Sequence, residues 1–218
     1  MSETIEECYH KLISKIDSSA MLVAVTKRQP ISKIKQVYAC GQKDFAENIV
    51  QEALTKIEEL KNFNITWHFI GAIQSNKTKQ IAENFDWVQS VASIKHAKRL
   101  NDQRPKHMKP LNVCIQVNIS QEENKSGVYP KEIVILANEI LRMKRLKLRG
   151  IMAIPAKEAH VAKQREVFAE LKKIFDEMNA QAYECDTLSM GMSGEYQVAI
   201  EEGSTMVRVG TALFGGRV

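Results

Sequence analysis

Short apolar runs alternate with longer amphipathic segments along almost the whole chain of 218 residues. Runs rich in β-branched residues indicate buried strands, and apolar positions three and four apart indicate helices. We predict strands at 21–25, 44–46, 66–70, 87–91, 112–119, 146–151, 187–189 and 206–209. Helical spacing follows each run, and such alternation is typical of parallel strands joined by crossover helices.

Helical spacing also precedes the first strand, at 5–16, where Thr4 and Glu7 form a predicted capping box. Eight strand–helix units in 218 residues predict a (β/α)8 barrel of the TIM type with an extra N-terminal helix. An open doubly wound sheet is the alternative, but no GxGxxG motif follows the first strand. Because the composition does not change along the chain, we expect a single domain over residues 1–218.

Composition excludes several classes of protein. No apolar run approaches 18 residues, and the polar N-terminus MSETIEEC is unlike a secretory signal, so we expect neither a membrane span nor secretion. The four cysteines lie far apart without a CxxC pair, which argues against a zinc site or a disulfide framework and favours a reducing cytoplasm.

The net charge of +5 suits anionic ligands but is too scattered to indicate nucleic acid. A basic run at 142–149 offers an alternative, binding of RNA or an anionic membrane. Leucines alternate with its cations and no aromatic residues interleave, which favours a solvated loop and strand end.

Lys27 follows the first predicted strand by two residues, within the run MLVAVTKRQP at 21–30. A lysine at the carboxyl end of a strand points into the mouth of an α/β barrel or sheet. Desolvation there disfavours the ammonium form, and the free amine is a nucleophile toward carbonyl carbon. The alternative is an ordinary surface lysine in a βα loop.

Two glycine-rich segments near the C-terminus have the composition of phosphate sites. In SMGMSGE, Gly191 and Gly194 let backbone amides converge beside the hydroxyl of Ser193. In MVRVGTALFGGR, Gly210 and Thr211 leave the eighth strand and open a short helix. Helix N-termini attract dianions, and barrels commonly bind phosphate after strands seven and eight. A role in turns alone is the alternative for each segment.

An amine and a phosphate cradle together indicate a phosphorylated aldehyde, either pyridoxal phosphate or a sugar phosphate in a class I aldolase. Strand alternation points Arg208 toward the same interior face as Gly210, where a cation would touch a ring nitrogen or a phosphate. The alternative is that Arg208 pairs with Glu201 or Glu202.

Seven motifs, in order along the chain, resemble those of the pyridoxal phosphate homeostasis proteins: AVTKRQP, FAENIVQE, WHFIGAIQSNK, NISQEENKSG, GIMAIP, LSMGMS and GSTMVRVGTALFG. That family is similar to the barrel domain of alanine racemase. The resemblance implies an alanine racemase N-terminal-domain-like barrel with pyridoxal 5′-phosphate as its cofactor.

The resemblance also implies roles for individual residues. Lys27 matches the lysine that forms the internal aldimine. Ser193, Gly210 and Thr211 match the phosphate-holding positions, while Ser189 and Gly191 shape that loop. Arg208 matches the arginine facing the pyridine nitrogen. Because arginine keeps its proton, the ring nitrogen stays unprotonated and the cofactor is a poorer electron sink.

Three further residues, Asn48, His68 and Lys125, match family positions near the cofactor mouth. For His68, a hydrogen-bonded core histidine is an equal alternative. For Asn48, the alternative is capping of the helix that begins near Ile49.

The chain ends at Val218, directly after the second glycine-rich segment, so we expect no second β-rich domain like that of the racemases. Racemisation needs two positioned proton-transfer groups, which favours a cofactor-holding protein over an efficient enzyme. An amino-acid racemase or lyase remains the alternative. We expect a cytoplasmic monomer whose partners are pyridoxal phosphate and, as recipients, pyridoxal phosphate-dependent apo-enzymes, without nucleic acid, membrane or metal.

Overall fold

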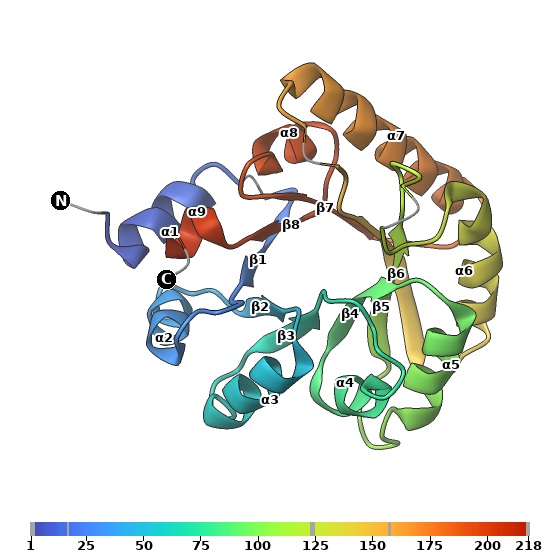
Figure 1. Cartoon of the computed structure of the whole chain (residues 1–218), viewed down its shortest axis with the longest axis horizontal. Helices are drawn as coiled ribbons and strands as arrows, with labels where there is room; N and C mark the ends of the chain where they lie inside the picture. The colour runs from blue at the N-terminus through green and yellow to red at the C-terminus, as the bar shows by residue number, and fades with distance from the viewer. Residues whose placement is uncertain (1–2, 17, 123–124, 157, 217–218) are drawn as a thin grey trace.

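The computed structural model describes residues 3–16, 18–122, 125–156 and 158–216. Eight parallel strands close into one barrel in chain order, and helices surround it (Figure 1). Closure is made by the pairing of the first strand with the last, in which Ala24 lies opposite Val209. The predicted barrel is therefore confirmed, and the open doubly wound sheet is wrong.

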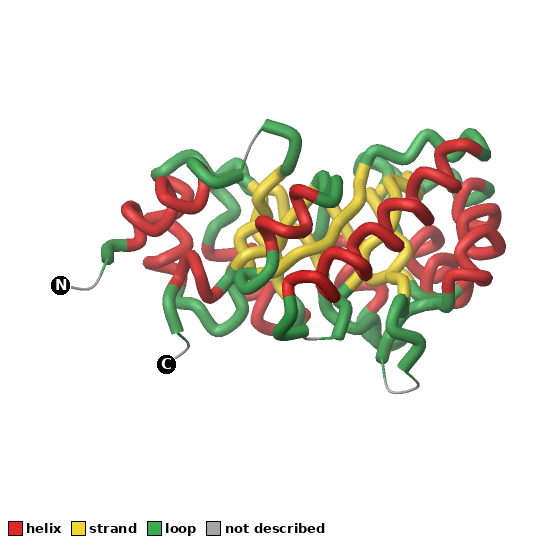
Figure 2. The backbone as a smooth tube through the Cα atoms, turned by 90° about the horizontal axis from the view of Figure 1, so that it is seen from above, coloured by secondary structure: helices red, strands yellow, loops and turns green. Residues whose placement is uncertain are grey.

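The strands are β1 (Met21–Val25), β2 (Asp44–Glu47), β3 (Thr66–Phe69), β4 (Trp87–Val91), β5 (Leu111–Val117), β6 (Leu146–Ala153), β7 (Thr187–Met192) and β8 (Met206–Val209). The helices are α1 (Ile5–Ile13), α2 (Ile31–Ala39), α3 (Val50–Glu59), α4 (Thr78–Asn84), α5 (Ile94–Gln103), the 3₁₀ turn η1 (Pro130–Glu132), α6 (Ile133–Leu141), α7 (Val161–Ala180), α8 (Tyr196–Glu201) and α9 (Thr211–Phe214). Helices flank the strands from end to end in the perpendicular view (Figure 2).

All eight predicted strands are present, but β6 and β7 extend two and three residues further than the hydrophobic pattern indicated. Pairing accounts for the extension of β6, because Met152 and Ala153 lie opposite Gln116 and Val117 of β5. In β7, the register against β8 shifts between Ser189 and Met192, as at a β-bulge. Where a strand ends in a closed sheet depends on its pairing with the neighbouring strands. A local hydrophobic pattern carries no information about that pairing.

The hydrophobic core has two parts, separated by the sheet. The larger part lies between the strands and the helices and includes Phe45, Phe69 and Phe85. The smaller part fills the barrel interior with the side chains Val23, Ala46, Trp87, Cys114, Met152 and Met206. Neighbouring side chains of one strand alternate between the two parts, as the period of two requires: in β1, Leu22 and Ala24 belong to the larger part and Val23 to the smaller.

The N-terminal helix α1 begins with the predicted capping box: the Thr4 hydroxyl accepts from the Glu7 amide, and the Glu7 carboxylate accepts from the Thr4 amide. This helix packs beside α2 and α9 (Figure 1). It therefore covers one side of the barrel.

Two cations of the basic run at 142–149 form ion pairs within the chain. Arg142 pairs with Glu139, and Arg149 forms a two-pronged pair with Asp186 while it lies over the ring of Trp87. These contacts agree with a solvated loop and strand end. Among the described helices, none has the length and apolarity needed to cross a bilayer.

Candidate functional site

A cavity of about 560 Å³ opens at the carboxyl ends of the strands, a volume within the range of roughly 300–1,000 Å³ that small-molecule sites occupy. Among its lining residues are six predicted from the sequence: Lys27, Asn48, Ser193, Arg208, Gly210 and Thr211. The lysine that follows β1 therefore shares one cavity with the glycine-rich segments that follow β7 and β8.

The backbone on both sides of Lys27 is held by hydrogen bonds. The Thr26 amide donates to the Ala46 carbonyl at 3.0 Å, which continues the β1–β2 pairing past Val25. Arg28 has a φ of +58°, an uncommon conformation for a residue with a side chain, and its amide donates to Glu52 Oε1 at 2.6 Å. Lys27 itself has neither a hydrogen bond nor an ion pair among the described residues.

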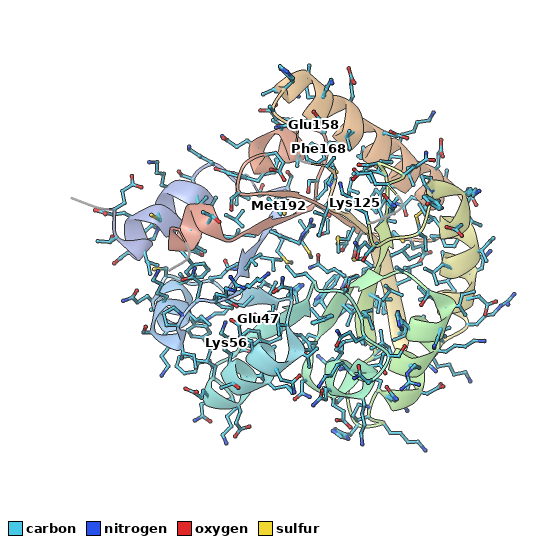
Figure 3. The ribbon with its side chains drawn as sticks, in the orientation of Figure 1. Glu47, Lys56, Lys125, Glu158, Phe168 and Met192 are labelled. Carbon is cyan, nitrogen blue, oxygen red and sulfur yellow. The ribbon has the colours of Figure 1, made fainter. Side chains whose placement is uncertain are left out.

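A buried lysine from α3 supports this loop from behind. Lys56 Nζ donates to the Thr26 carbonyl at 2.7 Å, to Glu47 Oε1 at 2.6 Å and to Glu52 Oε1 at 2.7 Å. Figure 3 shows Glu47 and Lys56 side by side between β2 and α3. Glu52 also accepts from the amide of Arg28. Lys56 is therefore connected to the backbone on both sides of Lys27, directly at Thr26 and through Glu52 at Arg28.

Glu47 is the most deeply buried member of this network, with a fully buried side chain. Burial raises the pKa of its carboxyl despite the opposing hydrogen bonds from Lys56 and Thr26. Its Oε1 receives both of those bonds, at 2.6 and 2.5 Å, while its Oε2 is buried without a partner. The stability of a buried carboxylate with one unpaired oxygen depends strongly on the cation that it pairs with, here Lys56.

The glycine-rich segments converge at Ser193. Its Oγ accepts hydrogen bonds from the amides of Gly210 and Ala212, at 3.2 and 3.3 Å, and so connects the loop after β7 to the start of α9. Gly191 shapes the β7 end of this arrangement: its φ is +92°, and a Cβ there would lie 2.6 Å from the Cβ of Ala199. Ser193, Gly210 and Thr211, from the loops after β7 and β8, thus line the cavity together.

Arg208 contributes a buried cation to the cavity wall. Its Nη1 donates to Ser189 Oγ at 2.5 Å, and its Nη2 donates to the Ala153 carbonyl at 2.8 Å. Burial lowers the pKa of Arg208 to about 10, so the guanidinium keeps its charge at neutral pH. The alternative that it pairs with Glu201 or Glu202 is wrong, because Arg165 binds both of those carboxylates.

Asn48 lies between β2 and α3 and lines the cavity. Helix α3 begins after Ile49 without a side-chain cap, so the alternative of a capping role for Asn48 is wrong. Its Oδ1 is buried and has no hydrogen-bond partner among the residues that the structure describes. An orphaned polar atom in a cavity wall indicates a missing polar partner.

The other predicted residues lie outside the cavity lining. Ser189 and Gly191 are buried in β7, which agrees with a role in shaping the loop. His68 is fully buried in the barrel interior, which favours its alternative as a hydrogen-bonded core histidine. Lys125 pairs with Glu122 at 2.8 Å instead of lining the cavity.

Sequence analysis did not single out several residues that the cavity region uses. Glu158 lines the cavity just before α7, Gln164 lines it from within α7, and Glu195 lines it just before α8. A signal for Lys56 was present, because it shares one face of α3 with the buried Ala53 and the adjoining Leu60. A lysine within an apolar stripe indicates a buried partner.

Comparison with known proteins gives a consistent assignment. The alanine racemase N-terminal domain model matches residues 2–218. A Pseudomonas aeruginosa relative named pyridoxal phosphate homeostasis protein is 46% identical over 224 residues, covering 98% of this chain and 96% of the relative. The structure of PipY from Synechococcus elongatus PCC7942 with PLP bound has a TM-score of 0.89 at 34% identity, covering 97% of this chain and 100% of that chain.

A solved alanine racemase from Clostridium difficile 630 has a TM-score of 0.82 at 14% identity, covering 97% of this chain and 56% of that chain. At this identity the likeness concerns the fold alone. The predicted resemblance is confirmed by the family match and by the close relatives. The chain belongs to the alanine racemase N-terminal domain family and, within it, to the pyridoxal phosphate homeostasis proteins.

Proposed function

We propose that this protein binds pyridoxal 5′-phosphate through Lys27 and serves intracellular pyridoxal phosphate homeostasis and amino-acid and keto-acid balance, without efficient catalysis of its own. The observation that carries the proposal is that Lys27 lines one cavity together with Ser193, Gly210 and Thr211. The names of the close relatives and the PLP-bound PipY structure support the same cofactor.

The residues present fit this group. A cavity of about 560 Å³ is lined by Lys27, which has no hydrogen bond among the described residues, and by the glycine-rich loops that Ser193 joins. When bound, pyridoxal phosphate supplies an aldehyde that condenses with an amine, with loss of water, and an electron-withdrawing ring. We assign the amine to Lys27, the phosphate contacts to Ser193, Gly210 and Thr211, and the ring-nitrogen contact to Arg208. Asn48 supplies a polar contact through its unpartnered Oδ1.

The names of the relatives, homeostasis proteins and not enzymes, support a carrier function. The second candidate is an amino-acid racemase or lyase. It is favoured by one observation: the carboxylates of Glu158 and Glu195 line the same cavity as Lys27 and offer further proton-transfer groups. Deuterium uptake at the Cα of alanine in heavy water, well above the rate with free cofactor and dependent on Lys27, would favour this candidate.

We propose a cytoplasmic monomer that passes the cofactor to apo-enzymes. The four free cysteines support a reducing compartment, and the partly exposed Ile154 and Met192 at the cavity give an apo-enzyme an apolar edge to contact. Transfer by contact is expected to be faster when the loaded protein and the apo-enzyme are mixed than when a dialysis membrane separates them.

The test of the binding proposal is an absorbance spectrum before and after borohydride reduction. Wild-type protein incubated with pyridoxal phosphate is expected to be yellow, and reduction should fix one label on the peptide that contains Lys27. Lys27→Ala should lose the chromophore and the label, whereas Lys131→Ala, at an exposed position in η1, should keep both.

Two results would contradict the proposal. One is the absence of any chromophore in wild-type protein at micromolar cofactor. The other is labelling of Lys27 by borohydride with a sugar phosphate but not with pyridoxal phosphate, which would indicate an aldolase.

A further inference from the structure

Polar side chains cross the barrel interior directly beneath the cavity. They come from β2, β3, β4, β7 and β8 and form one chain of hydrogen bonds through Asp44, His68, Gln89, Ser189 and Arg208. The individual distances are 3.0 Å from Asp44 Oδ1 to His68 Nε2, 3.0 Å from His68 Nδ1 to Gln89 Nε2, 2.7 Å from Gln89 Oε1 to Ser189 Oγ and 2.5 Å from Ser189 Oγ to Arg208 Nη1. An interior of this kind is normally filled by apolar side chains.

Arg208 determines the direction of every bond in this chain. A guanidinium only donates, so the oxygen of Ser189 must accept from Arg208. Among the described residues, Gln89 Oε1 is the acceptor within reach of the single hydroxyl hydrogen of Ser189, so that hydrogen is donated to it. The amide group of Gln89 consequently turns its NH₂ toward His68, where it also approaches the sulfur of Met206 at 3.2 Å.

The state of His68 follows from the same reasoning. Its Nδ1 accepts from Gln89 and therefore carries no hydrogen. Its Nε2 carries the hydrogen and donates it to Asp44. A hydrogen on Nδ1 would face another donor, so moving it there requires rotation of Gln89 and loss of the bond from Ser189.

Packing holds this chain of hydrogen-bonded side chains in place along the barrel. His68, Gln89 and Ser189 are fully buried, and the Trp87 ring stacks on the imidazole with a centroid distance of 5.3 Å. Asp44 is the first residue of β2, and its side chain is 22% exposed. Arg208 is the third residue of the four-residue β8 and lines the cavity. The chain of hydrogen bonds therefore runs from the partly exposed Asp44 at the amino end of the barrel to Arg208 in the cavity wall at the carboxyl end.

We propose that His68, Gln89 and Ser189 are positioning residues that orient the Arg208 guanidinium from the far end of the barrel, with His68 held as the neutral Nε2–H tautomer. The inference rests on the proposed function only in that Arg208 faces the cofactor ring. Two bonds fix the guanidinium, one to Ser189 and one to the Ala153 carbonyl, and this chain supplies the first. Loss of His68, Gln89 or Ser189 should change the environment of the ring nitrogen without altering a cavity-lining residue.

The first arm of the test uses the protein without cofactor. Long-range proton–nitrogen correlation spectra of histidine-labelled protein, with His68 assigned through His68→Gln, should show a protonated Nε2 and an unprotonated Nδ1. A protonated Nδ1, alone or together with Nε2, would overturn the inference whether or not the protein binds pyridoxal phosphate.

The second arm measures whether a change at Asp44 or Ser189 alters the position of the Arg208 guanidinium through these hydrogen bonds. Asp44→Ala removes the terminal acceptor, whereas Asp44→Asn keeps an oxygen that accepts from His68. Asp44→Ala and Ser189→Ala should shift the Arg208 side-chain resonances and, in loaded protein, the absorbance maximum, while Asp44→Asn should restore both. Ser189→Ala should also weaken cofactor binding about tenfold, because it removes a charge-assisted hydrogen bond.

Ser204→Ala is the matched control for a general loss of stability. Its hydroxyl is buried next to β7 and, within the described part of the protein, bonds only to the carbonyls of Leu188, Met190 and Met206, none of which is a group of the hydrogen-bonded chain. It should lower stability and leave the tautomer and the spectrum unchanged. If Asp44→Ala and Ser189→Ala leave the Arg208 resonances unchanged while borohydride still labels Lys27, the positioning role is wrong and the cofactor proposal stands.

Discussion

Replacing Lys56 by methionine is expected to lower the free energy of unfolding by about 3–5 kcal/mol, because it leaves the Glu47 carboxylate buried without a cation. Even in the intact protein, Glu47 Oε2 has no hydrogen-bond partner among the described residues. No hydrogen bond to that oxygen therefore offsets the loss of Lys56. Natural domains are stable by only about 5–15 kcal/mol, which makes this loss a large fraction of the total. Urea unfolding monitored by circular dichroism measures it.

The loss should grow with pH. Without Lys56, the folded-state pKa of Glu47 lies still further above the ordinary glutamate value of about 4.3, because burial already raises it and the main opposing cation is gone. A carboxyl whose pKa is raised in the folded state is stabilising below the unfolded pKa, and that stability is lost as pH rises through the folded pKa. The deficit of Lys56→Met relative to wild type should therefore be smallest at acid pH and largest at alkaline pH.

Controls separate the buried pair from loss of lysine in general. Lys61→Met removes an exposed lysine that pairs with Glu58 and should change stability by at most about 0.5 kcal/mol. The double variant Glu47→Leu with Lys56→Met should recover much of the lost stability, because it removes both buried charges together. A Lys56→Met variant that loses less than about 1 kcal/mol, with no pH dependence, would show that the pair has no such role.

The consequence for the site is as important as that for stability. Lys56 holds the Thr26 carbonyl and shares Glu52 with the amide of Arg28, on either side of Lys27. At temperatures where Lys56→Met remains folded, labelling of Lys27 by pyridoxal phosphate and borohydride should be slower than in wild type. Catalytic and binding groups depend on such supporting contacts for their position.

Gly150→Ala is the second substitution with a large expected effect. Gly150 has a φ of +149°, and a Cβ there would lie 1.9 Å from the carbonyl oxygen of Thr187 and 2.9 Å from its carbonyl carbon. Both atoms belong to the backbone of β7, so relief requires β6 and β7 to separate. The register between β5 and β6 also shifts between Val113 and Cys114, the residue opposite Gly150, so this part of the sheet is already irregular.

We expect Gly150→Ala to destabilise the protein by more than about 4 kcal/mol, which thermal unfolding or the soluble yield would reveal. Gly216→Ala is the matched control, since a Cβ at that position meets no atom within 4 Å, and it should be nearly neutral. A melting temperature of Gly150→Ala within a few degrees of wild type would mean that the two strands adapt with little cost.

The outline of the fold and the position of the cavity could be predicted from local patterns. Eight apolar runs alternating with helical spacing predict a parallel barrel, because each parallel connection needs a crossover. In such a barrel all carboxyl ends meet at one face, so Lys27 after β1 and Ser193 and Thr211 after β7 and β8 had to approach one another. The residues that sequence patterns placed at this face, Lys27, Ser193, Arg208, Gly210 and Thr211, therefore do line the cavity.

The partners of the buried polar groups were decided only by the tertiary structure. Glu47 and Asn48 are neighbours in sequence, yet Glu47 faces α3 and Lys56 while Asn48 faces the cavity. Ser189 and Gln89 are 100 residues apart and meet across the barrel interior. Alternation along a strand predicts two faces, but which face is the interior, and which strand lies opposite, depends on register and closure. His68 is an example. Its motif could not show where the side chain lies, and the structure places it beneath the cavity, in the hydrogen-bonded chain that ends at Arg208.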